Sequence, residues 1–171
     1  MTKPSSTRIY RDGDDTRSLR DAFGCFATGV TIVTARTAEG APVGLTVNSF
    51  SSVSLEPPLL LVCPARDAGS TAVLKQTERF AVNVLGSQDK ALSTRFARKG
   101  SERFGEDDWR TSEHGLPVLS RALAVFECTR EALHDGGDHI VLIGRILHAV
   151  YHPLDDPLLY FRGAYRGIHI D

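Results

Sequence analysis

Residues 44–58 read Gly-Leu-Thr-Val-Asn-Ser-Phe-Ser-Ser-Val-Ser-Leu-Glu-Pro-Pro. This run is too apolar for a free loop, yet it is crowded with short polar side chains: Thr46, Asn48, Ser49, Ser51, Ser52 and Ser54. A strand that ends within it would place backbone N–H groups and short side chains around a flat heteroaromatic molecule. We therefore expect this run to wrap a planar, polar ligand.

Length, composition and charge limit the classes of protein to which this chain can belong. The chain has 171 residues, of which 42% are apolar and 24% are charged, and its formal net charge is −1. These values suit one globular domain, which we place at residues 16–171 after a flexible N-terminal tail of residues 1–15. Because there is no basic excess, a small molecule is a better candidate partner than nucleic acid or a membrane surface.

The signals for cellular compartment favour the cytoplasm. No apolar run approaches the ~20 residues of a membrane-spanning helix, and residues 1–15 lack the apolar core of a signal peptide. Cys25, Cys63 and Cys128 are far apart and odd in number, which disfavours a disulfide framework or a zinc site. We expect three buried, reduced thiols in a cytoplasmic protein.

Strand-like runs outnumber helical ones. Apolar periodicity and capping residues predict helices from residue 15 or 16 to Gly29, over residues 70–76, and from Ser87 to about residue 99; β-branched or apolar runs predict strands at residues 30–37, 43–49, 59–63, 80–85, 122–131, 140–150 and 158–162. A hairpin turn is expected at residues 38–42. The polar residues 100–117 are expected to form a long surface connection that could act as a lid. This pattern favours a mainly β fold, a closed or nearly closed antiparallel barrel with peripheral helices.

The familiar motifs of nucleotide binding and nucleophilic catalysis are missing. Neither G-x-G-x-x-G nor G-x-x-x-x-G-K-[ST] occurs, so a nicotinamide nucleotide would need another kind of surface. There is no G-x-S-x-G, and the three cysteines lie in strand or helix contexts. Covalent catalysis is therefore not supported, and a flavin is our working hypothesis for the planar ligand.

Two imidazoles and two carboxylates fall within six residues: His134, Asp135, Asp138 and His139. Such a set could bind a divalent metal, but Gly136-Gly137 between them instead suggests a solvated turn. A third possibility is that His139 faces a ligand, because it stands at the mouth of a long apolar strand. We favour the third and predict no metal site.

The loop of residues 65–71 combines Arg66 with small and hydroxyl residues at an expected helix start, which suits a phosphate. Ser70 could equally serve only as a helix cap. Arg98 or Lys99 could add a charge, although basic residues that end a helix are more often simply solvated. Near the chain end, Tyr165 could lie over a ligand plane, with packing as the default.

With these residues in view, the chain resembles the short-chain flavin reductases that serve two-component flavin-dependent monooxygenases. The resemblance covers about residues 19–167. Its marks are Phe-Ala-Thr-Gly-Val-Thr-Ile-Val-Thr at residues 26–34, the run at residues 44–54, Pro57-Pro58, Gly-Asp-His at residues 137–139 and Tyr-Phe-Arg-Gly-Ala-Tyr at residues 160–165. Together these motifs are specific, whereas each alone is weak.

The resemblance implies a homodimeric split β-barrel, a Greek-key FMN-binding barrel that holds flavin near the subunit interface. Position by position, it implies that flavin contacts come from Thr46, Val47, Asn48, Ser49, Ser52, Ala65, Ser70, Thr71 and Lys99. His139 is expected near the nicotinamide or the flavin edge, and we assign it to the nicotinamide together with Tyr165. One departure is Gly69, where relatives often carry Asn, so a side-chain contact to the flavin tail is in doubt.

The implied function is an NAD(P)H:flavin oxidoreductase that reduces FMN or FAD, with NADH slightly favoured, and supplies reduced flavin to a separate monooxygenase. Hydride transfer between the two cofactors needs ring positioning and stabilisation of developing negative charge, but no protein acid or base, so no catalytic residue is assigned. The alternative is a non-catalytic flavin carrier or sensor of the same fold. A metal enzyme built on His134 and His139 is a more distant alternative.

Overall fold

Antiparallel strands dominate this computed structural model, which describes residues 8–100, 102–105, 109–152 and 155–168. The strands are β1 (Thr28–Gly29), β2 (Thr31–Arg36), β3 (Pro42–Val47), β4 (Ser51–Leu55), β5 (Pro58–Val62), β6 (Arg79–Val84), β7 (Trp109–Thr111), β8 (Pro117–Leu119), β9 (Ala124–Gly136), β10 (His139–Tyr151), β11 (Leu159–Phe161) and β12 (Ala164–Arg166). The helices are α1 (Thr16–Phe23), α2 (Gly69–Leu74) and α3 (Lys90–Ala97), and a 3-10 turn at Ser87–Asp89 precedes α3.

Seven strands form the main sheet, in the order β3-β2-β6-β9-β10-β5-β4. Every neighbouring pair in it is antiparallel. The expected mainly β class with peripheral helices is confirmed. Closure is not complete, because β3 and β4 remain the two edges of this sheet. An open edge strand keeps one row of backbone N–H and C=O groups free of sheet pairing.

The hairpin of β2 and β3 confirms the prediction from residues 30–49. Its turn contains Gly40, which has a φ of +86°, a value that glycine adopts without strain. On β2, Ile32 packs in one apolar cluster with Phe96 of α3, and Val33 packs in the other with Leu74 of α2. Successive side chains of a strand point to opposite faces, so β2 is buried on both.

The run that opens the sequence contains a strand that the sequence did not predict. β4 pairs with β5 in a hairpin, with Ser51 opposite Leu61 and Leu55 opposite Pro58. The hydroxyl-rich composition concealed this strand, because the polar side chains lie on an exposed sheet edge. Leu55 remains 89% exposed there.

The longest hairpin joins β9 and β10, each of 13 residues. We expected residues 134–139 to separate two shorter strands, and this was wrong. Both strands continue to the tip, where Gly136 pairs with His139 and Gly137 turns the chain with a φ of +71°. The tip therefore carries His139 on a rigid ribbon instead of a loose loop.

The segment at residues 100–117, expected to be a surface connection, contains the short hairpin of β7 and β8. Residues 101 and 106–108 of that segment lie outside the described residues, as do residues 1–7 of the expected tail. Trp109 of β7 packs on Phe96 and Phe104, with ring centroids 5.3 and 4.9 Å away. The hairpin is thus a packed element beside α3.

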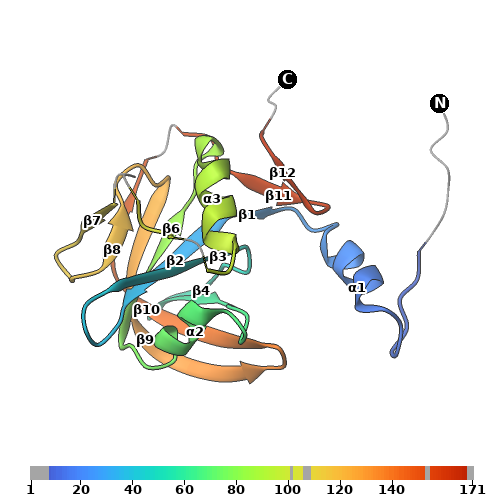
Figure 1. Cartoon of the computed structure of the whole chain (residues 1–171), viewed down its shortest axis with the longest axis horizontal. Coiled ribbons are helices and arrows are strands. Elements are labelled where there is room, and N and C mark those ends of the chain that lie inside the picture. The colour runs from blue at the N-terminus through green and yellow to red at the C-terminus, as the bar shows by residue number, and fades with distance from the viewer. Residues whose placement is uncertain (1–7, 101, 106–108, 153–154, 169–171) are drawn as a thin grey trace.

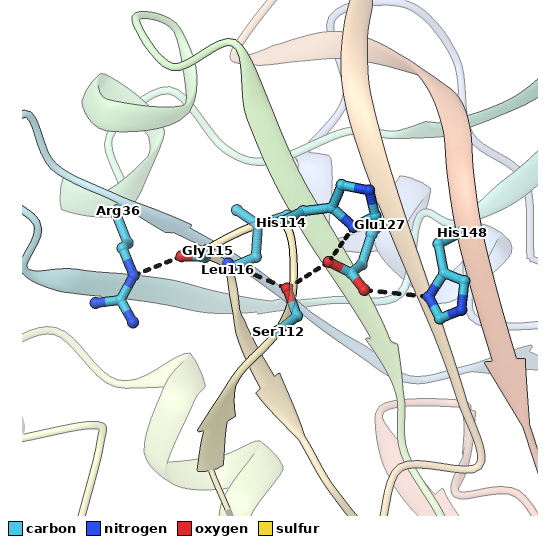
Figure 2. A network of polar contacts seen from close by, with 7 residues as sticks. All are labelled: Arg36, Ser112, His114, Gly115, Leu116, Glu127 and His148. Carbon is cyan, nitrogen blue, oxygen red and sulfur yellow. Dashed lines mark hydrogen bonds and ion pairs between the residues drawn. The ribbon is translucent and has the colours of Figure 1, made fainter.

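A buried carboxylate ties the β7–β8 connection to the long hairpin (Figure 2). The side chain of Glu127 on β9 is 5% exposed and accepts a hydrogen bond from the Ser112 hydroxyl. The Nδ1 atoms of His114 and His148 lie 3.1 and 3.2 Å from its two oxygens. Because a carboxylate only accepts, both imidazoles carry a proton on Nδ1 in this arrangement.

Helix α1 is shorter than expected and stands to one side of the sheet (Figure 1). Asp15 caps it by accepting from the Arg17 N–H at 2.9 Å. It ends at Phe23, not at Gly29, because the chain at Gly24 meets the β11–β12 turn, where the Arg162 N–H donates to the Gly24 carbonyl. No residue of α1 is buried. None of the helices within the described ranges is long and apolar enough to cross a membrane.

Candidate functional site

A cavity of about 260 Å³ opens beside the end of β3, and we call it the edge cavity. Seven of the residues predicted from the sequence lie in its wall: Thr46, Val47, Asn48, Ser49, Ala65, Lys99 and His139. These residues are far apart in the chain, and the end of β3, the loop before α2, the end of α3 and the start of β10 meet around the cavity. The residues assigned to a planar ligand are therefore brought together.

Two of the hydroxyls in this wall already have protein partners. The Thr46 hydroxyl donates to the Ser93 carbonyl of α3 at 2.7 Å. The Ser49 hydroxyl accepts from the Cys63 N–H at 2.8 Å and lies 3.1 Å from the Cys63 carbonyl. These bonds fasten β3 to α3 and to the end of β5. Both side chains shape the wall, which leaves the exposed Asn48 amide as the polar side chain of this run that is available to a ligand.

The backbone of β3 supplies further donors on its open side. Gly44 directs its carbonyl away from β2, towards the hydroxyl of Ser70 at 2.7 Å. Alternate residues of an antiparallel strand direct their backbone groups to the same side, so the Thr46 N–H also points to the open edge. A Cβ at residue 44 would lie 2.9 Å from the Phe96 ring, so α3 packs this closely only against glycine.

One end of the edge cavity is charged. The Lys99 ammonium lies 2.7 Å from the Asp67 carboxylate, and both side chains are exposed. Lys99 lowers the pKa of Asp67, first through this hydrogen bond, with His139 adding a smaller effect. Arg103 lines the same cavity, and its partners among the described residues are neutral oxygens of Gly44, Ser70 and Arg98. A phosphate would meet two cations and one anion here.

His139 belongs to the same wall and is anchored by its backbone and its side chain. Its backbone forms a bridge with Ala65, and its Nδ1 lies 2.7 Å from an oxygen of Asp138. The hairpin tip is further held by the Arg66 N–H, which donates to the Asp138 carbonyl at 2.9 Å. The pKa of Asp138 is lowered, chiefly by the hydrogen bond with His139. The imidazole is therefore fixed at the cavity by the carboxylate beside it.

Four residues predicted for the site lie elsewhere. Ser52 is exposed on the edge strand β4. Thr71 is buried and donates to the Ala65 carbonyl at 2.7 Å, and Ser70 is buried and donates to Gly44. The Tyr165 hydroxyl lies 2.8 Å from the hydroxyl of Ser93, and the carbonyl of the same serine accepts the hydrogen bond from Thr46. In this structure none of the four is in the wall of the edge cavity.

Seven residues of the cavity wall were not among the predicted contacts: Leu45, Cys63, Asp67, Ala68, Phe96, Ala97 and Arg103. Cys63 and Phe96 carry apolar patterns that a core position explains equally well, so their sequence holds no separate signal. Burial raises the pKa of the Cys63 thiol. Arg103 belongs to a polar segment of irregular structure, and only the fold shows that it reaches back to β3.

The cluster at residues 134–139 does not gather around a common point. Asp135 is paired with Arg66, and Asp138 is paired with His139. Within the described part of the chain, no three side chains of His, Cys, Asp or Glu are placed to hold a metal ion.

Fold and site together define a class: an open antiparallel barrel whose edge strand borders a cavity with Lys99 and Arg103 in its wall. The chain belongs to the family described as "Flavin reductase like domain", whose model matches residues 23–169. The expected family is confirmed.

Three similar proteins illustrate the family. The chain is 46% identical over 162 residues to the FMN reductase (NADH) SmoA of Agrobacterium fabrum, covering 95% of this chain and 91% of the relative. It is 42% identical over 156 residues to the flavin-dependent monooxygenase reductase subunit HsaB of Mycobacterium tuberculosis, covering 90% and 83%. The NADH:FAD oxidoreductase SgcE6 of Streptomyces globisporus, solved with NAD and FAD fragments, superposes with a TM-score of 0.89 at 36% identity, covering 96% and 99%.

Proposed function

We propose that this protein is an NAD(P)H:flavin oxidoreductase, with NADH favoured, that reduces FMN or FAD and supplies reduced flavin to a separate monooxygenase. The observation that carries the proposal is the edge cavity, where Asn48, the open backbone of β3 and two cations surround one space. Relatives named as FMN reductase and as a monooxygenase reductase subunit support the same reaction.

The donor set of the edge cavity fits a flavin. The Asn48 amide and the Thr46 N–H suit the polar edge of the pyrimidine ring, and Val47 and Phe96 provide apolar wall. Lys99 and Arg103 suit the phosphate, because both carry positive charge at one end of the cavity. A flavin held here would supply the hydride-accepting chemistry, with the nicotinamide as donor. The chain binds, orients and polarises, and we assign it no proton transfer.

We assign His139 to the nicotinamide, since it faces the cavity from the hairpin tip. The bond to Asp138 keeps the Nδ1 atom occupied, so the Nε2 edge of the ring is the part available to a ligand. Tyr165 remains a proposed nicotinamide contact only through a change of side-chain position, because its hydroxyl is now bonded to Ser93. The role of His139 is orientation of the nicotinamide ring.

We further propose that the protein is a homodimer. Helix α1 buries none of its residues. Phe23, its last residue, and Phe26, which follows it, are 69% and 76% exposed. Leu55 is exposed on the edge strand β4, and Leu147 is exposed on β10. The two lie at the same end of the sheet, because Leu147 follows Arg145, which pairs with Leu59 of β5. Exposed aromatic and aliphatic side chains on an unpaired edge suit a second copy. Light scattering with size exclusion checks this, and a monomeric mass would overturn it.

A cytoplasmic location is also proposed, because Cys25, Cys63 and Cys128 are free thiols, as in proteins of reducing compartments.

Steady-state turnover tests the function. Each nicotinamide nucleotide is crossed with each flavin, and oxidation of the nicotinamide is followed by its near-ultraviolet absorbance. We expect turnover with NADH exceeding that with NADPH. A protein that binds flavin but oxidises neither nucleotide would be a carrier or sensor, and the proposed activity would be wrong.

A further inference from the structure

The tip of the β9–β10 hairpin, residues 135–139, extends past the last pair that β5 makes with β10, in which Val62 lies opposite Leu142. A two-stranded ribbon is only marginally stable by itself. The chain after β5 nevertheless continues beside the tip, because Ala65 and His139 form an antiparallel bridge in the same register. A third segment of chain therefore supports the tip.

Arg66 fastens this third segment to the tip. Its backbone N–H donates to the Asp138 carbonyl at 2.9 Å, and its Nε donates to the Gly137 carbonyl at 2.7 Å. The guanidinium also pairs with the Asp135 carboxylate on β9. Because a guanidinium holds its N–H groups in a rigid planar fork, Arg66 contacts the turn and β9 together. Asp135 is 92% exposed, so the bond to the turn carbonyl is the stronger part of this contact.

Arg66 is absent from the wall of the edge cavity, yet its neighbours are part of it. Ala65, Asp67 and Ala68 line the cavity from the loop before α2, and His139 lines it from the tip. The Arg66 side chain instead bonds to the turn of the hairpin. Arg66 therefore links two parts of one wall without reaching the cavity.

The loop and the tip differ in their other anchors. The loop is bonded to α2, because the buried Thr71 hydroxyl donates to the Ala65 carbonyl at 2.7 Å. The side-chain bond of His139 goes to Asp138, which belongs to the tip itself and so does not fasten the tip to the rest of the fold. Loss of the Arg66 side chain would therefore leave the loop in place and loosen the tip.

We propose that Arg66 is a positioning residue for the nicotinamide: it holds the hairpin tip so that His139 keeps its place in the wall of the edge cavity. This inference rests on the proposed assignment of His139 to the nicotinamide. Arg66 touches neither cofactor. The flavin contacts assigned to Asn48 and to the backbone of β3 do not depend on the tip, so the Arg66 side chain affects nicotinamide binding and not flavin binding.

Arg66→Ala removes the contact with the tip. Arg130→Ala is the matched control, because the Arg130 guanidinium also joins the β9–β10 hairpin to α2 through a carbonyl, that of Lys75, but lies outside the edge cavity and away from the tip. Arg66→Lys is a second variant, which keeps the positive charge but replaces the planar fork with a single ammonium group.

The first measurement is amide hydrogen exchange over residues 134–140 of the ligand-free protein, after thermal melts show that each variant is folded. We expect exchange about tenfold faster in Arg66→Ala and about threefold faster in Arg66→Lys, with no change in Arg130→Ala. Arg66→Lys carries the test if Arg66→Ala does not fold. Unchanged exchange at the tip in the folded Arg66 variants would overturn the inference.

The second measurement compares NADH and FMN. We expect Arg66→Ala to raise the KM for NADH about five- to tenfold, with kcat and the dissociation constant of FMN changed less than about twofold. In a His139→Ala background, Arg66→Ala should change the KM less than about 1.5-fold, because the two residues act through one contact.

Equal factors in the two backgrounds would show that Arg66 acts without His139 and would overturn the inference, as would an FMN affinity that falls as much as the KM rises. An intact protein that oxidises no NADH would instead overturn the proposed function, and the exchange of the tip would still show whether Arg66 holds it.

Discussion

Lys99 and Asp67 form an ion pair of 2.7 Å at the rim of the edge cavity. The pair lowers the pKa of Asp67, so this carboxylate is charged at neutral pH. Its negative charge lies where the phosphate of a flavin is proposed to bind. A bound phosphate would therefore compete with Asp67 for the same ammonium group.

Replacing Asp67 with Asn should strengthen binding of FMN. The change removes a negative charge that would repel the flavin phosphate, and it frees Lys99. Because the free energy of an exposed ion pair is small, the dissociation constant of FMN should fall only about two- to fivefold. Lys99→Met should raise it. Both effects should shrink at high salt, where exposed charges are screened. Asp135→Asn is the control, because Asp135 pairs with Arg66 outside the cavity. Weaker binding by Asp67→Asn would contradict the phosphate placement.

Asn48→Leu should weaken flavin binding. Among the residues of the run that line the cavity, Thr46 and Ser49 are bonded to backbone groups, whereas the Asn48 amide is exposed to a ligand. Loss of a partner for a buried ligand edge costs about 1–3 kcal/mol. Fluorescence titration measures the change. Gln88→Leu removes an exposed amide outside the cavity and should have no effect. An unchanged affinity for Asn48→Leu would refute this position for the pyrimidine ring.

His139→Ala should raise the KM for NADH more than it raises the dissociation constant for flavin. The reason is that His139 is held at the cavity by Asp138 and by the bridge to Ala65, facing the space proposed for the nicotinamide. His134→Ala is the matched control, since His134 is exposed on the same hairpin and absent from the cavity wall. If both variants leave the KM unchanged, His139 has no place in the site.

Glu127→Gln should lower the free energy of unfolding by about 1–3 kcal/mol, because an amide nitrogen would then face an N–H donor in a buried network. The network is shown in Figure 2. Glu131→Gln on the same strand breaks only the exposed pair with Arg145 and should lower the free energy of unfolding by less than Glu127→Gln does. Urea unfolding compares the two. Equal losses would mean that the buried carboxylate contributes no more than a surface one.

Alkaline pH should destabilise the protein partly through Cys128. Burial raises the pKa of this thiol to about 12, from an ordinary value of 9.0. The folded-state pKa is the higher one, so the stabilisation is fully present below about pH 9 and is lost as the pH rises towards about 12. Between about pH 8 and pH 10.5, the intact protein should lose on the order of 1–2 kcal/mol more than Cys128→Ala. Parallel losses in urea titrations would contradict this.

The fold was largely predictable where one residue pattern has one physical meaning. The β-branched run at residues 31–34 can be buried on both faces of a strand, and β2 is. The helix stripe that includes Phe26 was extended too far, because sequence periodicity cannot show that Gly24 meets the backbone of Arg162. The degree of barrel closure was also overestimated, because local sequence patterns do not show whether the two edge strands of a sheet pair with each other.

The site was predictable to the extent that neighbouring residues share a wall. Residues 46–49 form one, as expected, and His139 joins them from the hairpin tip. The phosphate contacts of Ser70 and Thr71 stay predictions. A hydroxyl bonds equally well to a ligand or to a carbonyl, and in this structure both hydroxyls donate to carbonyls. Arg103 was missed because its placement depends on tertiary contacts with Gly44.

The most direct test of the central claim is an anaerobic titration of the protein, premixed with FMN or FAD, with NADH. Flavin binding is first established by fluorescence quenching, and the visible absorbance of oxidised flavin is then followed as NADH is added. The account predicts stoichiometric bleaching of the flavin with matching oxidation of NADH, far faster than in a mixture without protein. Flavin that binds the protein but keeps its visible absorbance in excess NADH would contradict it.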